Sequence, residues 1–326
     1  TGTWTNLSNT APYSGVTTAN LSINPATAAM NAYVYRCVVS GTCAPAVNSN
    51  CAILTVNSPI TITSQPSAST LCAGGQTTFT VGASGSNPTY QWQESTDNGA
   101  SWNNINNGGV YSGAATSVLT LTNVTAVMSG NQYRAVVTGT AVCGIPINSG
   151  AGLLTVNTAP AITTQPVAST TLCAGNNTTY TVVANGTALT YQWQLSTTGA
   201  GGPWTDISNT GVYSGSATAS LTITGVVVGM DTYQYRAVVS GTCTPPAISN
   251  AAVLTVNTPI SITTQPVLTI NVCATGSASF TTIAGGTSPS YQWQVSSNGG
   301  TSWANVANGG VYAGASSTTL MISNIT

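Results

Sequence analysis

A unit of about 100 residues recurs along this chain of 326 residues, and the recurrence limits the fold more than any other feature of the sequence. The dipeptide Gln-Pro returns at residues 65–66, 165–166 and 265–266. Two series of cysteines keep nearly the same spacing: Cys43, Cys143 and Cys243, and Cys72, Cys173 and Cys273. A period of this length matches one domain, so the sequence predicts a string of similar domains, each with its own core.

The repeat also sets the expected domain boundaries. The segment Leu-Thr-Val-Asn closes three units, and a short proline-containing linker follows each copy. We expect complete domains at residues 58–157 and 158–257, with partial ones at residues 1–57 and 258–326. Because proline stiffens the linkers, the string should be extended. We also expect the native polypeptide to continue at both ends, unless other chains complete the partial units.

Composition and patterning favour strands over helices in every unit. Thr, Val, Ile and Tyr are abundant, whereas Lys is absent and Glu and Arg are rare. Alternating polar and apolar residues, separated by turn residues such as Asn98 and Gly99, indicate short strands. We therefore predict an all-β fold. In the predicted domain at residues 58–157 the expected strands are residues 60–64, 76–83, 89–95, 102–105, 117–122, 132–138 and 149–156.

A tryptophan and a later tyrosine make the fold class specific. The units carry a tryptophan in the segment Tyr-Gln-Trp-Gln (Trp92, Trp193 and Trp293) and a tyrosine followed by arginine farther along (Tyr35, Tyr133 and Tyr235). This pattern resembles an immunoglobulin domain, which has a core Trp on strand C and a Tyr near the start of strand F. The chain resembles, over essentially its whole length, the tandem repeats of large secreted or cell-surface adhesin-type proteins of Bacteroidota-like bacteria.

The resemblance implies tandem immunoglobulin-like β-sandwich repeats of about 100 residues. It implies strands C′ to G in residues 1–57 and strands A to E in residues 258–326. It also implies a disulfide between strands B and F, but small apolar residues occupy the positions concerned. These residues are Val81 and Ala135 in one unit, and Val182 and Ala237 in the next. We therefore expect packing against the tryptophan to take the place of that disulfide.

Eight cysteines in a chain without histidine favour disulfides over metal sites, and disulfides favour an oxidising, extracellular compartment. Two pairings of the recurring cysteines remain open. An intradomain pairing joins Cys72 to Cys143 and Cys173 to Cys243. In the immunoglobulin fold these partners lie at opposite ends, roughly 25 Å apart, whereas a disulfide requires Cα atoms within about 7 Å. An interdomain pairing joins Cys72 to Cys243 and leaves Cys143 and Cys173 to units outside the chain.

The first unit holds two further cysteines, Cys37 and Cys51. The resemblance places them on strands F and G, at positions symmetric about residue 44. We expect either a cross-strand disulfide between them or two free, buried thiols.

Charge is scarce, and this scarcity excludes several classes of function. Only 2% of the residues are charged and the net charge is −1, so we expect no surface for nucleic acid or anionic lipid. No apolar run approaches the roughly 20 residues that span a bilayer. A near-neutral surface lacks the repulsion that keeps proteins apart, so we expect association with other copies of the chain.

Catalysis has few candidate residues. The chain has neither His nor Lys, which removes the common general bases and Schiff-base nucleophiles. Glu94 and Asp97 are the only close pair of carboxylates and could form a glycosidase pair or hold one Ca²⁺. Leu195 and Val295 replace Glu94 in other units, however, so we expect a solvated hairpin. We predict no catalytic residue, no metal site and no cofactor.

A second aromatic series offers a candidate binding surface. It consists of Trp102, Trp204, Trp303, Tyr111 and Tyr213. These rings could stack on the sugar rings of a surface glycan, or they could cover the face of the sheet. Arg134 and Arg236 follow the tyrosine of strand F, and we expect them to stack on the edge of the core tryptophan or to pair with a carboxylate.

Together these features predict a secreted structural protein that is not an enzyme. We expect an extracellular stalk or filament of immunoglobulin-like repeats that mediates surface adhesion or contact with cells or matrix. Two alternatives are a glycan-binding adhesin and a spacer in a large secreted enzyme whose catalytic domain lies outside this segment.

Overall fold

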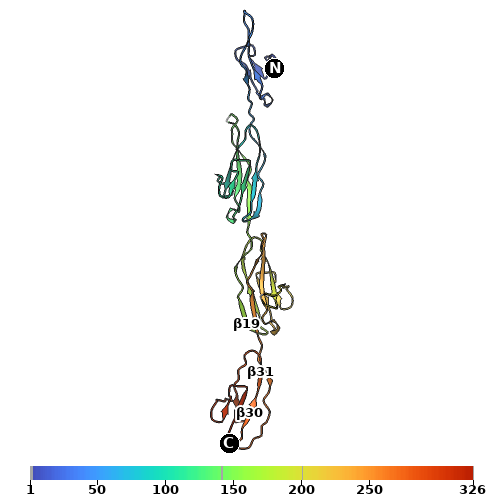
Figure 1. Cartoon of the computed structure of the whole chain (residues 1–326), viewed down its shortest axis with the longest axis vertical. Coiled ribbons are helices and arrows are strands. Elements are labelled where there is room, and N and C mark those ends of the chain that lie inside the picture. Colours follow the sequence, from blue (N-terminus) through green and yellow to red (C-terminus); the bar gives the residue numbers. More distant parts are fainter. Residues whose placement is uncertain (1–2, 141, 200, 326) are drawn as a thin grey trace. The chain divides into compact units, whose positions relative to one another are not determined.

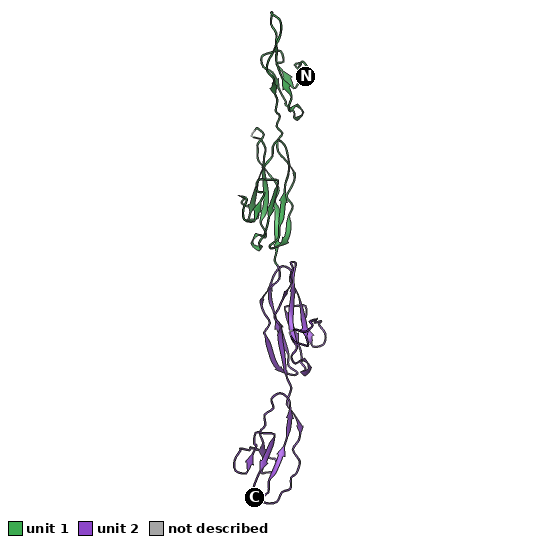
Figure 2. Cartoon of the chain, viewed as in Figure 1, with its two compact units in different colours: residues 1–158 green, residues 159–326 purple. Residues whose placement is uncertain are grey.

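The computed structural model describes residues 3–140, 142–199 and 201–325. The chain divides into two compact units, residues 1–158 and residues 159–326 (Figure 2). Strands make up nearly all of the regular structure in the described part (Figure 1). Short 3₁₀ helices are η1 (Ala28–Met30), η2 (Ala126–Met128) and η3 (Val228–Met230). The outermost predicted domain limits, residues 1 and 326, lie outside the described residues.

Residues 58–157 of the first unit contain two sheets and a short pair of strands. The larger sheet has the order β12-β11-β15-β17-β8, with β16 paired to β15, and the smaller sheet has the order β13-β14-β9. The first strand, β7, pairs with β10. The bounds are β7 (Thr61–Ser64), β8 (Ser69–Cys72), β9 (Thr77–Thr80), β10 (Gly82–Ser84), β11 (Thr89–Ser95), β12 (Asn103–Asn104), β13 (Tyr111–Ser112), β14 (Val118–Leu121), β15 (Gln132–Thr138), β16 (Ile147–Asn148) and β17 (Gly152–Asn157).

The second unit repeats this arrangement strand for strand in residues 159–257. Its larger sheet has the order β19-β28-β26-β22-β23, with β27 paired to β26, and its smaller sheet has the order β20-β25-β24, while β18 pairs with β21. The bounds are β18 (Ala161–Thr164), β19 (Ser169–Cys173), β20 (Thr178–Thr181), β21 (Val183–Asn185), β22 (Thr190–Ser196), β23 (Thr205–Asp206), β24 (Tyr213–Ser214), β25 (Ser220–Ile223), β26 (Gln234–Ser240), β27 (Ala247–Ile248) and β28 (Ala252–Asn257).

The remaining residues of each unit form smaller sets of strands. In the first unit these are the pairs β1 (Tyr13–Ser14) with β2 (Ser22–Ile23), β3 (Val34–Tyr35) with β6 (Ala52–Ile53), and β4 (Val38–Val39) with β5 (Val47–Asn48). In the second unit they are β29 (Ser261–Thr264) with β31 (Ile283–Gly285), β32 (Gln294–Val295) with β33 (Ala304–Asn305), and the sheet of β30 (Ala278–Thr281), β35 (Thr319–Ile322) and β34 (Tyr312–Ala313). With few strands to cover them, apolar residues such as Val39 and Ile53 are 60% and 70% exposed.

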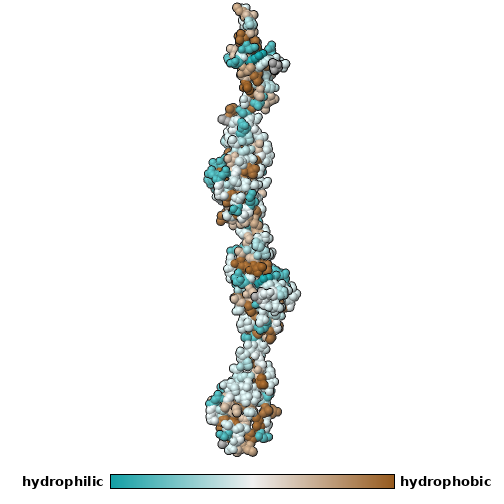
Figure 3. Space-filling view, in the orientation of Figure 1, coloured by the Kyte–Doolittle hydropathy of each residue, from teal (hydrophilic) through white to brown (hydrophobic). Residues whose placement is uncertain are grey.

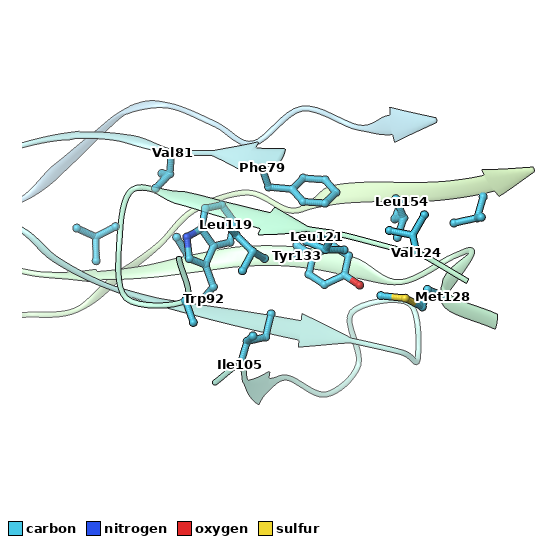
Figure 4. Packing of buried hydrophobic residues seen from close by; sticks show 14 of the residues in the cluster. Phe79, Val81, Trp92, Ile105, Leu119, Leu121, Val124, Met128, Tyr133 and Leu154 are labelled. Atoms are coloured by element: carbon cyan, nitrogen blue, oxygen red, sulfur yellow. The ribbon is translucent and has the colours of Figure 1, made fainter. Parts of the chain in front are cut away.

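The core of each complete sandwich is built around the tryptophan of Tyr-Gln-Trp-Gln. Trp92 is fully buried among residues of both sheets, including Phe79, Leu119 and Tyr133 (Figure 4). Its indole Nε1 donates a hydrogen bond of 2.9 Å to the carbonyl of Thr116, so the only polar atom of the ring has a partner. Trp193 is buried in the same way and donates to Thr218 at 2.9 Å.

Small residues opposite the tryptophan leave room for the ring. In the antiparallel ladder of β11 and β15, Trp92 lies opposite Ala135, and Trp193 lies opposite Ala237 in the second unit. Ala135 and Val81 occupy the positions at which an immunoglobulin domain has its disulfide, and both are buried in this core, as expected. Side-chain packing therefore links the two sheets at this point.

The first strands differ from the sequence prediction. One strand was expected over residues 76–83, but the structure has β9 and β10, which pair with different neighbours, and the register shifts between Gly82 and Ala83. The strand β8 was not predicted at all. It pairs in parallel with β17. Because the two strands lie far apart in the sequence, no local alternation of residues identifies them as partners.

Replacing the core tryptophan should test this description of the core. We expect Trp92→Ala to lower the free energy of unfolding of its domain by about 3–5 kcal/mol, because the substitution leaves a large cavity. The measurement is urea unfolding followed by circular dichroism. Trp102→Ala, at a half-buried position of the same domain, should cost about 1 kcal/mol or less. Equal losses for the two variants would contradict the assignment of Trp92 as the centre of the core.

Candidate functional site

The first and last strands of the larger sheet lie side by side and run in the same direction. In the first unit, β8 pairs with β17 in parallel over four residue pairs, from Ser69 opposite Leu154 to Cys72 opposite Asn157. In the second unit, β19 pairs with β28 in parallel over five residue pairs. The backbone N–H of Ala73 extends the first ladder by donating to the carbonyl of Asn157 at 2.8 Å. We call this pairing the terminal ladder.

The recurring Gln-Pro dipeptide explains how the chain reaches the terminal ladder. Pro66 is buried and lies between β7, which pairs with β10, and β8, which pairs with β17. Because proline has no N–H and cannot continue a ladder, the chain leaves its first partner here and crosses to the larger sheet. Gln65 fixes the crossing, since its Oε1 accepts a hydrogen bond of 2.6 Å from the N–H of Gly150, just before β17.

The second unit repeats this contact. The Oε1 of Gln165 accepts a hydrogen bond of 2.8 Å from the N–H of Asn250, two residues before β28. We call Gln65 and Gln165 the glutamine clamps. Sequence reasoning used their spacing to find the repeat but assigned them no role. The recurrence of a polar residue beside a strand-breaking proline was the available signal.

The second tryptophan of each unit lies against an arginine. The Arg134 guanidinium carbon is 4.2 Å from the ring centroid of Trp102, and its Nε donates to Oε1 of Gln93 at 2.9 Å. Arg236 lies 4.2 Å from Trp204 in the same way and donates to Gln194 at 2.9 Å. A cation–π contact at such a site contributes about 0.5–1 kcal/mol.

This geometry corrects the expected role of the arginines. They were expected to stack on the core tryptophan or to pair with a carboxylate. Tyr133 points into the core and is fully buried, so its neighbour Arg134 points to the outer face of the sheet, where Trp102 lies. Arg134 therefore occupies one face of a ring that was a candidate for sugar stacking. Trp303 has no such arginine among the described residues and is 61% exposed.

The tyrosines of the aromatic series occupy a different position. Tyr111 packs partly buried against the core, and its hydroxyl donates to Oε1 of Glu94 at 2.7 Å. Tyr213 packs against the second core, and its hydroxyl lies 3.3 Å from that of Tyr235. The structure thus gives these tyrosines contacts with the core, while Trp102 and Trp204 contact the arginines.

The two carboxylates have separate sets of hydrogen-bond donors. Oε1 of Glu94 also accepts from the hydroxyl of Tyr133 at 2.9 Å and from Nδ2 of Asn131 at 2.7 Å. Asp97 instead accepts from the side chain and backbone N–H of Ser101, which lower the pKa of the Asp97 carboxyl to about 2. Burial, together with the bond to Glu94, raises the pKa of Tyr111 to about 12.

These contacts favour a structural role for both carboxylates. Glu94 and Asp97 line an open hollow with Tyr111 and Asn131. Glu94 nevertheless accepts hydrogen bonds from a pair of tyrosines and from Asn131, whereas Asp97 accepts hydrogen bonds within its own loop. In the described part of the chain, no group of three His, Cys, Asp or Glu residues could hold a metal ion. The same residues contain no helix long and apolar enough to cross a membrane.

The cysteines fall into two states. Cys72 and Cys243 are disulfide-bonded, whereas Cys143 and Cys173 are free thiols. Neither of the intradomain pairings considered from the sequence is therefore present among these described residues.

Cys37 and Cys51 are free and exposed, which differs from both expectations for this pair. The register of β3 and β6 pairs Tyr35 with Ala52 and so sets Cys51 opposite Arg36. Because neighbouring residues of a strand point to opposite faces, Cys37 and Cys51 face opposite ways and form no bridge.

The family described as Domain of unknown function (DUF8696) matches residues 61–158 and residues 163–258. These two stretches cover more than half of the chain, and each contains one complete sandwich. No curated protein matches the chain in sequence.

Solved structures of tandem immunoglobulin domains match the chain. The I-band fragment I67–I69 from titin has 19% identity and a TM-score of 0.56, with 82% of this chain and 89% of that chain covered. Extracellular domains 3–5 of Drosophila OTK have 16% identity and a TM-score of 0.36, with 82% and 90% covered. The titin fragment shows the fold alone and confirms the prediction of tandem immunoglobulin-like domains. A relation to bacterial surface proteins stays a prediction.

The hydrogen bond between Tyr111 and Glu94 can be tested by placing leucine at position 94, because the second unit has Leu195 at the equivalent position. We expect Glu94→Leu to lower the pKa of Tyr111 from about 12 but to leave it above 10, because burial is the larger cause of the shift. NMR of ¹³C-labelled tyrosine, over the pH range in which the chain stays folded, measures this. Tyr213, whose pKa burial raises without a carboxylate partner, is the internal reference. An unchanged titration of Tyr111 would contradict the contact.

Proposed function

We propose, from the premise that this chain belongs to the family described as Domain of unknown function (DUF8696), that it is a load-bearing extracellular stalk. Its immunoglobulin-like domains transmit force along the chain and carry out no catalysis. The observation that carries this proposal is the terminal ladder, because it joins the strand by which the chain enters the larger sheet to the strand by which the chain leaves each complete domain.

The direction of the strands determines how a pulling force acts. Tension along the chain pulls β8 toward its N-terminal end and β17 toward its C-terminal end. Since the two strands are parallel, this tension slides one strand along the other and loads all the hydrogen bonds of the ladder together. An antiparallel hairpin pulled at its open end would instead lose its hydrogen bonds one at a time. The terminal ladder is therefore suited to resist extension.

The glutamine clamps strengthen the same path. Gln65 ties the segment before β8 to the residue Gly150 before β17, so the clamp must break before the two strands can slide. Gln165 does the same at β28. These side chains are exposed, and a surface hydrogen bond contributes little to equilibrium stability, so their repeated presence fits a mechanical role better than a role in the core.

The surface supports a role in an assembly of chains. Only 2% of the residues are charged, and most of the surface in the view of Figure 3 is pale, which marks intermediate hydropathy. Such a surface presents little electrostatic repulsion to another copy of the chain. The disulfide-bonded cysteines support an oxidising, extracellular location. A glycan-binding role has weaker support, because Arg134 already covers one face of Trp102.

Single-molecule pulling in a reducing buffer tests the proposal, since no disulfide then contributes to the force. We expect Gln65→Ala with Gln165→Ala to lower the unfolding force of both complete domains while changing the midpoint of urea unfolding little. The matched control is Leu119→Ala with Leu221→Ala, which empties the two cores and should cost about 2–5 kcal/mol per domain but leaves the ladder intact.

The comparison between the two double variants decides the outcome. If the clamp variant unfolds at the force of the unchanged chain, while the core variant unfolds at a much lower force, then the ladder does not bear the load. That result would exclude the terminal ladder as the basis of a stalk function.

A further inference from the structure

A row of polar side chains crosses the outer face of the larger sheet in the complete domain at residues 58–157. Gln93 of β11 lies opposite Arg134 of β15 on one side and opposite Asn104 of β12 on the other side. Residues directly opposite each other in an antiparallel ladder point to the same face of the sheet. These three side chains are therefore neighbours, and we call them the outer row.

Hydrogen bonds connect the outer row from one end to the other. The Nε2 of Gln93 donates to Oδ1 of Asn104 at 2.9 Å, and the Oε1 of Gln93 accepts from Nε of Arg134 at 2.9 Å. The ring of Trp102 stacks against the guanidinium, and its own Nε1 donates to the carbonyl of Gly99 at 3.1 Å. The Arg134 side chain is therefore fixed both in position and in orientation.

The charge of Arg134 has no counter-charge beside it in the described part of the chain. A guanidinium has five N–H donors, and Gln93 accepts from one of them, so the N–H groups of Nη1 and Nη2 remain free to bind another group. Burial lowers the pKa of Arg134, whereas a nearby carboxylate would raise it. The charged side chain is thus held in place and partly removed from water without an anion beside it.

We propose that the outer row binds the carboxylate of an acidic sugar, as found in a polysaccharide that contains uronic acid. The Nη1 and Nη2 groups lie side by side at the end of the planar guanidinium, so they can donate two parallel hydrogen bonds to the two oxygens of one carboxylate. The indole of Trp102 is half-buried, and its exposed part can contact the C–H groups of the sugar ring that carries the carboxylate. A small anion without a sugar ring matches only the first of these contacts.

This site goes beyond the proposed stalk function and does not depend on it. The outer row takes no part in the terminal ladder, so either proposal can fail while the other holds. The site also differs from a stacking platform for neutral sugars. The arginine that covers one face of Trp102 here supplies the main contact with the ligand.

The complete domain at residues 159–257 carries the same row with one acidic residue in it. The Nε of Arg236 donates to Oε1 of Gln194 at 2.9 Å, and the guanidinium stacks on a tryptophan in the same way. The Nε2 of Gln194 donates to Oδ1 of Asp206 at 2.8 Å, and Asp206 takes the place of Asn104. Because the negative charge of Asp206 repels an approaching carboxylate, we expect this second row to bind acidic sugars less tightly than the outer row.

Titration of the whole chain with a short oligogalacturonate, followed by NMR, tests the site. The seven tryptophan residues are labelled with ¹⁵N, and their indole signals are assigned from Trp→Phe variants. In a buffer of low ionic strength, we expect the Trp102 signal to shift and to saturate, and the Trp204 signal to require a ligand concentration about twice as high or higher. The ligand controls are a neutral oligogalactoside of the same length and sodium acetate at the same carboxylate concentration, which should shift Trp102 much less.

Variants of the arginine separate the contribution of its geometry from that of its charge. We expect Arg134→Gln to abolish the saturating shift of Trp102. Arg134→Lys keeps the charge but loses the two parallel donors, so it should weaken binding several-fold. Arg236→Gln is the matched control and should leave the titration of Trp102 unchanged, because it alters only the other complete domain.

An exchange of the third side chain of the row tests the sign of the ligand charge. Asn104 and Asp206 are both exposed, so either change should leave the core of its domain intact. We expect Asn104→Asp to weaken binding in its domain and Asp206→Asn to strengthen binding in the other, each by about twofold or more at low ionic strength. Unchanged affinities in both variants would contradict an anionic ligand.

Three further results would overturn the proposal. An unaltered titration of Trp102 in Arg134→Gln would show that the carboxylate does not bind this arginine. An equal response to the neutral oligogalactoside or to acetate would exclude an acidic sugar as the ligand. The absence of a saturating shift at Trp102 in the unchanged chain would exclude the site itself.

Discussion

The burial of one tryptophan against an alanine on the neighbouring strand determines how each complete domain is built. Trp92 fills the space between the two sheets, and the small side chain of Ala135 opposite it leaves room for the ring. The hydrogen bond from the indole to Thr116 fixes the ring and also ties the loop before β14 to the core. This packing supplies the link between the sheets, so the domain keeps the immunoglobulin arrangement without a disulfide at that position.

Because the core links the two sheets, the strands at the edge of the larger sheet can make other contacts. Pro66 ends the first pairing of the chain, Gln65 holds the crossing, and β8 reaches β17 to complete the terminal ladder. In the stalk that we propose, the parallel pairing of the first and last strands of the larger sheet resists extension by shear of several hydrogen bonds together. The proposal therefore assigns force resistance to the ladder at one edge of the sandwich and fold stability to the tryptophan at its centre.

The outer surface follows from the same division. Few charges and many Thr, Ser and Asn residues leave the surface nearly neutral, and the rare arginines lie on tryptophan rings of their own domain. Glu94 is held by two tyrosines and Asn131. These polar groups have partners within the domain, which fits a structural role for them.

The sequence by itself determined the period, the all-β class, the tryptophan-centred core and the tyrosine of strand F, because these depend on local alternation and on residues repeated at fixed spacing. It located Gln65 and Pro66 but not their role, and it predicted that Arg134 stacks on the core tryptophan or pairs with a carboxylate, whereas Arg134 lies over Trp102. Only the tertiary structure decided that β8 pairs with β17, that Cys37 and Cys51 face opposite ways, and that Cys143 contacts Asn57. Each of these depends on the register between strands distant in sequence, and a shift of one residue in that register reverses which face a side chain occupies.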